Sequence, residues 1–164
     1  MTDPIAPVLM LGGMTRILLA NTIGDHWRIC VQDERLLELS LVDLSEVVLI
    51  DCLSPGEERI HGDDVLDRLH KMHILPLGWS AFLKLRFNYI VKGPESELEW
   101  LRTHRGVEQC AFFGTIFQCA HDRRIEGVIC LYWNRRRKRW GFYVDRFNAI
   151  AHSRHAKCLA LPAS

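Results

Sequence analysis

The clearest chemical signal in this sequence is a run of five consecutive cations with a tryptophan on either side. The cations are Arg135, Arg136, Arg137, Lys138 and Arg139, and the flanking residues are Trp133 and Trp140. Each Lys or Arg that contacts a phosphate releases condensed counterions, and the planar side chain of arginine binds phosphate oxygens in pairs. Indole rings beside the cations offer bases a stacking surface. The run therefore predicts contact with nucleic acid or a ribonucleoprotein.

The same run has two other interpretations. Turns between strands are commonly charged because they are solvated, and both tryptophans fit a role in the core equally well. A cationic hairpin can also recognise an acidic protein surface. We therefore keep a protein–protein interaction module, such as an inhibitor or adaptor, as the alternative to nucleic-acid binding.

The two ends of the chain carry opposite charge. Residues 1–100 contain nine Lys and Arg against sixteen Asp and Glu, a net charge of −7, whereas residues 101–164 contain twelve against four, a net charge of +8. A strongly basic C-terminal part predicts that the protein binds a polyanion, and it does not point to catalysis. The opposite charges also allow the two ends to dock on each other, or two copies to associate head to tail.

A second group of chemically active residues lies near the C-terminus, where His152, His155 and Cys158 follow one another at every third position. Imidazole nitrogens and thiolates are zinc ligands. On a helix, however, these side chains would spread over about 120°, and Cys119 and His121 are candidates for a fourth ligand by residue type alone. The spacing matches no standard zinc motif, and two solvent-facing histidines beside a buried thiol fit it as well. We therefore assign neither a metal nor a cofactor.

The third group is acidic and lies in a predicted helix. Asp63, Asp67 and His70 share one face at i, i+4 and i+7 if residues 63–74 are helical. Carboxylates and imidazoles can hold a divalent ion that activates water for phosphodiester hydrolysis, so a metal-dependent nuclease is the third hypothesis. Acids and histidines also occupy the solvated face of ordinary amphipathic helices.

Known catalytic motifs are missing from the sequence. It contains no Gly-x-Ser-x-Gly, no Gly-x-x-x-x-Gly-Lys and no Gly-x-Gly-x-x-Gly, and no serine or cysteine nucleophile stands out. The sequence therefore favours a small non-enzymatic binding or accessory protein, without deciding the question.

Short strands and helices must position these groups. Apolar runs at residues 16–20, 26–32, 36–41 and 46–52 predict a β meander, although residues 36–42 also fit a helix. Helices are predicted from residue 63 up to Pro76, over residues 80–87, and between residues 95 and 105. Strands follow at residues 110–118, 127–133 and 140–147. In the first two, both alternating sets of residues are largely apolar, which is typical of a sheet that is covered on both faces. The basic run is then the turn of a hairpin, and residues 149–159 fit a closing helix.

The predicted fold is α+β, with an N-terminal β region, two or three central helices and a C-terminal three-stranded antiparallel meander. We expect one globular domain over residues 1–164, with any internal boundary near residues 54–62. No segment reaches the ~20 apolar residues of a membrane span, and no basic region precedes the short apolar stretch at the start of the chain. We therefore expect a cytoplasmic protein with no membrane partner and with reduced cysteines.

Overall fold

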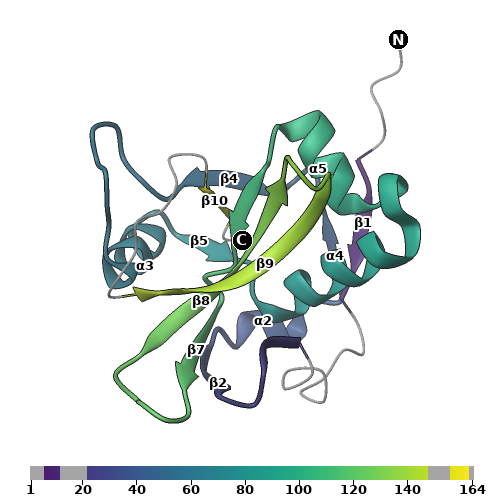
Figure 1. Cartoon of the computed structure of the whole chain (residues 1–164). Helices are drawn as coiled ribbons and strands as arrows, with labels where there is room; N and C mark the ends of the chain where they lie inside the picture. The colour runs from purple at the N-terminus through teal and green to yellow at the C-terminus, as the bar shows by residue number, and fades with distance from the viewer. Residues whose placement is uncertain (1–5, 12–21, 148–155, 163–164) are drawn as a thin grey trace.

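A large curled sheet joins strands from both ends of the chain (Figure 1). The structure is a computed structural model, and it describes residues 6–11, 22–147 and 156–162. In chain order, the strands of this sheet are β2 (Trp27–Gln32), β4 (Val48–Asp51), β5 (Ile74–Pro76), β6 (Gln109–Ala111), β7 (Thr115–Cys119), β8 (Glu126–Asn134), β9 (Arg139–Arg146) and β10 (Ala156–Pro162). Hydrogen bonds connect them in the order β2-β7-β8-β6-β10-β4, with β9 added to β8 and β5 added to β10. Two further strands, β1 (Val8–Met10) and β3 (Leu41–Asp43), form a small separate sheet.

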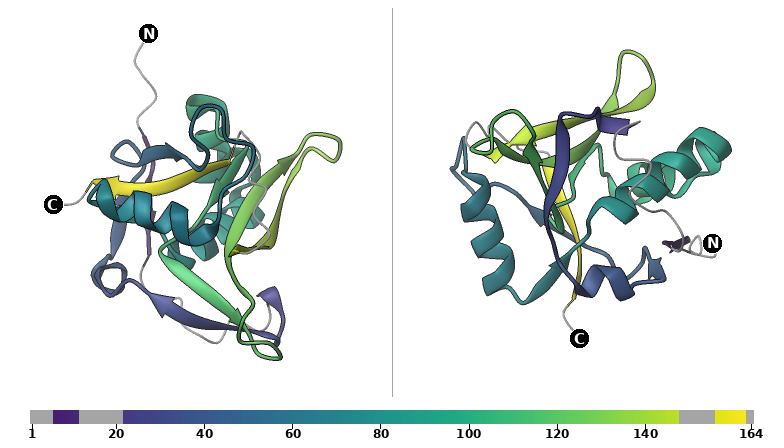
Figure 2. Two further views of the ribbon diagram at one scale, coloured as in Figure 1. Left: turned by 90° about the vertical axis from the view of Figure 1, so that its left-hand side faces the viewer. Right: turned by 90° about the horizontal axis from the view of Figure 1, so that it is seen from below.

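The helices pack against two apolar cores on different sides of the large sheet (Figures 1 and 2). They are α2 (Arg35–Glu38), α3 (Gly62–Lys71), α4 (Trp79–Lys92) and α5 (Glu97–Arg105), with a 3-10 turn, η1 (Gly93–Glu95), between the last two. One core contains Phe82 of α4 and Leu98 of α5, whereas the other contains Val65 and Leu69 of α3. None of the helices in the part of the chain that the structure describes is long and apolar enough to cross a membrane.

The central strand β8 contributes to both cores, because successive side chains of a strand point to opposite faces. Ile129 and Leu131 belong to the core of α4 and α5, and Val128 and Cys130 belong to the core of α3. The prediction that this strand is covered on both faces is confirmed.

The prediction of an α+β fold is confirmed, but the N-terminal meander is wrong. The strand β2 pairs with β7, β3 pairs with β1, and β4 pairs with β10. Residues 36–42 divide between the helix α2 and the strand β3, and residues 16–20 lie outside the described residues. The sequence between these runs has no tight two-residue hairpin signal. No local turn therefore makes consecutive strands pair with each other, and each pairs with a strand distant in the sequence.

In the C-terminal part, the predicted hairpins are present, but the strand predicted before them and the helix predicted after them differ in the structure. The strands β7, β8 and β9 pair antiparallel in chain order. The predicted strand at residues 110–118 is interrupted between β6 and β7, where Gly114 packs against the end of β5 and the residues that follow it. A Cβ on this glycine would lie 2.3 Å from the Pro76 carbonyl oxygen. The predicted closing helix is wrong from residue 156 onward, where β10 pairs with β4, β5 and β6; its earlier residues lie outside the described part.

The three predicted helices are present, but the first ends earlier than predicted. The helix α3 stops at Lys71, and residues 74–76, which the predicted helix includes as far as Pro76, form β5 and pair with β10.

Local signals set the ends of the last helix. The Ser96 hydroxyl accepts the Glu99 backbone N–H at the start of α5, and Gly106 ends the helix with a left-handed φ of 67°. The helix α4 runs longer than predicted, to Lys92, where Gly93 ends it with a φ of 58°. Together, α4 and α5 form the support beneath the β8–β9 hairpin.

Candidate functional site

The basic run forms the turn of the β8–β9 hairpin, which projects from the body of the molecule (Figure 2). Asn134 and Arg139 face each other as the last pair of the ladder. The Asn134 side-chain oxygen accepts the backbone N–H of Arg137 at 2.9 Å, and Lys138 adopts a left-handed φ of 49°. The predicted hairpin is therefore present, with its turn defined by a side-chain hydrogen bond and one left-handed residue.

Most of the cations on this turn have no acidic partner among the residues that the structure describes. All five residues from Arg135 to Arg139 are exposed. Arg135 donates from two nitrogens to the Glu108 carboxylate, at 2.5 and 2.9 Å. Within the described ranges, the side chains of the other four make no ion pair. The turn therefore presents an exposed and largely uncompensated positive charge.

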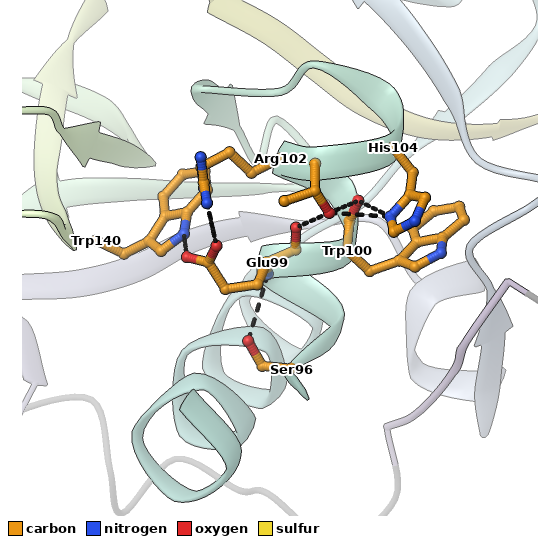
Figure 3. Close-up of polar contacts among 7 residues, drawn as sticks. Ser96, Glu99, Trp100, Arg102, His104 and Trp140 are labelled. Carbon is orange, nitrogen blue, oxygen red and sulfur yellow. Dashed lines mark hydrogen bonds and ion pairs between the residues drawn. The ribbon is translucent and has the colours of Figure 1, made fainter. Parts of the chain in front are cut away.

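Trp140 anchors the hairpin to α5 (Figure 3). Its side chain is only 8% exposed, and its indole N–H donates to Glu99 Oε1 at 2.9 Å. The same carboxylate accepts the Arg102 guanidinium at 2.7 Å. The base-stacking role predicted for Trp140 does not agree with this burial, because the indole belongs to the core.

Trp133 completes the anchor from the opposite strand. It is partly buried, lies directly across the ladder from Trp140 and meets that ring edge-on, with centroids 5.9 Å apart. The Arg102 guanidinium lies over the Trp133 ring, 4.3 Å from its centroid. Both tryptophans therefore hold the hairpin in place, and one ring face of Trp133 is already occupied by an arginine.

A pocket of about 370 Å³ opens beside the hairpin, between α4 and the strands β8 and β9. Its polar and aromatic lining includes Arg86, Arg137, Arg139, Tyr89, Tyr132 and Phe142, and among the described residues no aspartate or glutamate lines it. Two of its arginines come from the basic run and the third comes from the helix. The pocket thus combines positive charge with aromatic surface.

Arg86 is the partly buried one among the three arginines of the pocket, whereas Arg137 and Arg139 are exposed. Its guanidinium lies over the Phe142 ring, 4.5 Å from the centroid, and burial lowers the pKa of Arg86. No carboxylate in the described part of the chain forms an ion pair with it. A partly desolvated cation without an acidic partner favours an anion in the space beside it.

Gly141 shapes the neighbouring wall of the pocket. It pairs directly with Tyr132 across the ladder, and a Cβ at this glycine would lie 2.7 Å from the Tyr132 ring. The absence of a side chain lets the Tyr132 ring lie close to the backbone of β9, on the face of the sheet where it also contacts the Tyr143 ring.

Sequence reasoning found the cations and missed Arg86 and Tyr89, which lie on α4 far from the basic run. A signal was present, since a charged and an aromatic residue three positions apart on a helix lie on one face. The same helix carries Lys84 and Phe87 at the same spacing, so this signal alone does not single out Arg86. Nothing local connects it to residues 137–139.

The zinc candidates are not brought together where the structure describes them. Cys158 is fully buried in β10, and burial raises the pKa of its thiol. His152 and His155 lie outside the described residues. Over residues 6–11, 22–147 and 156–162, no group of three or more His, Cys, Asp or Glu is arranged to hold a metal ion.

The acidic face of α3 also forms no such group. Asp63, Asp67 and His70 are exposed on the helix, as the periodicity predicts, and they are included in the search for metal-binding groups just described. The nearby Glu57 is engaged by the Arg68 guanidinium at 2.5 Å. The structure thus brings the three onto one solvated face without building a ligand cluster.

Arg123 and Arg124 lie in the turn between β7 and β8, at the opposite end of β8 from the basic run (Figure 1). Arg124 is paired with Asp122 at 3.1 Å. As a meander requires, these cations do not extend the positive surface of the hairpin.

Comparison of the chain with models of protein families, with curated proteins and with solved structures found no match, so the site must be interpreted from its own chemistry.

Proposed function

We propose that this protein is a small non-enzymatic binding protein that engages nucleic acid, free or in a ribonucleoprotein, through the β8–β9 turn. The observation that carries the proposal is the exposed run from Arg136 to Arg139, whose cations have no acidic partner in the described part of the chain. Such a surface gains free energy on meeting phosphates because bound counterions are released.

The anchor beneath the turn supports this proposal. The Trp140–Glu99 hydrogen bond and the Arg102–Trp133 contact fix the base of the hairpin on α5. A fixed base lowers the entropic cost of aligning several cations with a phosphate backbone. The exposed arginine side chains can contact phosphates without reading the base sequence.

An acidic protein surface is the alternative partner, and salt-dependent binding to nucleic acid separates the two. The test measures fluorescence anisotropy with labelled single- and double-stranded RNA and DNA at about 50 mM and about 200 mM salt. The variant neutralises the turn by changing Arg136, Arg137 and Lys138 to Gln. The matched control removes the same number of charges elsewhere, by changing Arg59, Lys71 and Arg123 to Gln.

We expect salt-sensitive binding by the wild type, a loss of at least tenfold in the turn variant, and a much smaller change in the control. The slope of log K against log salt should fall by about 0.7–0.9 for each lost phosphate contact. If the turn variant binds as well as the wild type, or if nucleic acid is not bound even at the lower salt concentration, the proposal fails. A search for an acidic protein partner would then follow.

A further inference from the structure

We infer that the pocket between α4 and the β8–β9 hairpin holds one unpaired nucleotide, so that the partner is single-stranded nucleic acid. This inference rests on the proposed function and narrows it to one class of partner. It assigns the base to Tyr89, the aromatic residue with which α4 lines the pocket. It assigns the adjoining phosphates to Arg137 and Arg139, which both line the pocket and belong to the basic run.

The size of the pocket suits a group of this kind. Its volume of about 370 Å³ lies within the range of roughly 300–1,000 Å³ that is common for small-ligand sites. Its position continues the surface of the turn, because Asn134, Arg137 and Arg139 contribute to both. A strand held along the turn therefore has a recess beside it in which a base can be placed.

The chemistry of the walls favours a nucleotide over an acidic peptide. An aspartate or glutamate side chain would use the arginines but has no ring to place against Tyr89. A base uses both, since every base has a π face that stacks on aromatic side chains and every nucleotide carries a phosphate. The Asn134 side chain also carries amide N–H donors, because only its oxygen is used by the Arg137 backbone N–H.

Arg86 adds an independent reason for an anion at this site. It is partly buried, it contacts Phe142 instead of a carboxylate, and it lies on the opposite wall from the basic run. Burial lowers its pKa, which marks the cost of desolvating the cation. A phosphate or an electronegative base edge in the pocket offsets that cost.

The geometry also argues against a duplex as the preferred partner. A base in a double helix is paired and stacked, and it reaches a pocket only after it is flipped out at a cost of a few kcal/mol. An unpaired base enters without that cost. Single-stranded nucleic acid should therefore bind more tightly than a duplex of equal charge.

The test compares three probes: a single strand of about 16 nucleotides, an abasic strand of the same length, and a duplex of about eight base pairs, which carries about the same charge and should bind more weakly than the single strand. Two variants remove pocket chemistry, Arg86→Met and Tyr89→Leu. Their matched controls on the same helix are Lys84→Met and Phe87→Leu, which change a cation and an aromatic residue outside the pocket lining. Circular dichroism and urea unfolding establish that each variant is folded.

We expect the wild type to bind the single strand roughly 5- to 150-fold more tightly than the abasic strand, which corresponds to the stacking of one base. Tyr89→Leu should remove most of this preference and leave abasic binding unchanged. Arg86→Met should weaken binding of the single strand at least threefold, and the two controls should bind as the wild type does.

The outcomes separate this inference from the proposed function. If the normal and abasic strands bind equally, or if both pocket variants match their controls, the pocket does not hold a base. The function would still stand in that case, provided that neutralising the turn abolishes binding. If neutralising the turn has no effect on any probe, the proposed function itself fails and the inference fails with it.

Discussion

The indole N–H of Trp140 donates to the Glu99 carboxylate across 2.9 Å, and this bond joins two residues 41 positions apart in the chain. Glu99 lies in the first turn of α5, and Trp140 lies near the start of β9. The carboxylate is 6% exposed and also accepts the Arg102 guanidinium. The buried Glu99 carboxylate thus binds both Arg102 of α5 and Trp140 of β9, and it fixes the base of the hairpin to the helix.

Replacing Glu99 with alanine should destabilise the protein by about 1.5–3 kcal/mol, because it leaves the Trp140 N–H and the Arg102 cation without their acceptor. Glu99→Gln keeps an oxygen for the indole and should cost less. Urea unfolding measures both changes. Glu95→Ala, at an exposed position just before α5, serves as the control and should change stability by less than about 0.5 kcal/mol. Equal stability of the Glu99→Ala variant and the control would rule out the anchoring role.

Because the backbone of Lys138 is left-handed, the stability of the protein should depend on the shape of the side chain at this position as well as on its charge. A non-glycine residue with a φ of 49° carries a cost of about 1–2 kcal/mol that glycine avoids. Lys138→Gly should therefore raise stability by up to about 1 kcal/mol, whereas Lys138→Val should lower it by about 1 kcal/mol or more, since a branched Cβ is worst in this region. Both variants remove the same charge, so urea unfolding isolates the backbone effect. Arg136→Gly, at a residue without positive φ, should not stabilise.

The elements that sequence reasoning found are those whose signals are local. Ser96 and Gly106 mark the ends of α5 within a few residues of the helix. The β8–β9 hairpin is likewise defined by two aromatic strands and the charged turn between them. Partner choice is not local: β2 pairs with β7, and the Arg28–Gln118 side-chain hydrogen bond within that pair joins residues 90 positions apart. The short apolar run at the end of the chain fits helix and strand equally, and three strand partners settle it as β10.

The candidate site divides in the same way. The five cations stand together in the sequence, so their joint exposure was predictable. The burial of Trp140 was not, because it depends on Glu99 in a different element. Arg86 reaches the pocket only because α4 packs beside the strands β8 and β9. A single sequence therefore revealed the charge of the site but not the pocket beside it.

Acid should weaken the fold partly through Glu57. The Arg68 guanidinium, and then the Ser54 backbone N–H, lower the pKa of Glu57 to about 2, below the value of about 4.3 expected in the unfolded chain. Because the folded-state pKa is the lower one, this stabilisation is fully present above pH ~4.3 and is lost as the pH falls toward about 2. Arg68→Gln removes the partner, so its stability deficit relative to the wild type should shrink over that interval. Urea unfolding across a pH series measures the deficit. Arg59→Gln, at an exposed position nearby, should show no such convergence, and a pH-independent deficit for Arg68→Gln would contradict this account.

Glu108 should restrain nucleic-acid binding, because it is the acid that pairs with the first cation of the basic run. Its carboxylate accepts two Arg135 nitrogens, so Arg135 must give up this partner before it contacts a phosphate. Glu108→Gln removes the competing charge and should raise the affinity for single-stranded nucleic acid. The slope of log K against log salt should steepen by about 0.7 for the added phosphate contact.

Folding stability should change by less than about 1 kcal/mol in the Glu108→Gln variant, since an exposed ion pair contributes little. Anisotropy titrations over a salt series give the affinity and the slope together. Adding Arg135→Gln should cancel the gain, because the freed cation is then absent, whereas adding Arg59→Gln should leave it in place. If Glu108→Gln gains affinity even without Arg135, the effect is a general reduction of negative charge and not the release of this arginine. If it gains none, Arg135 does not contact phosphate, and the contact surface of the turn begins at Arg136.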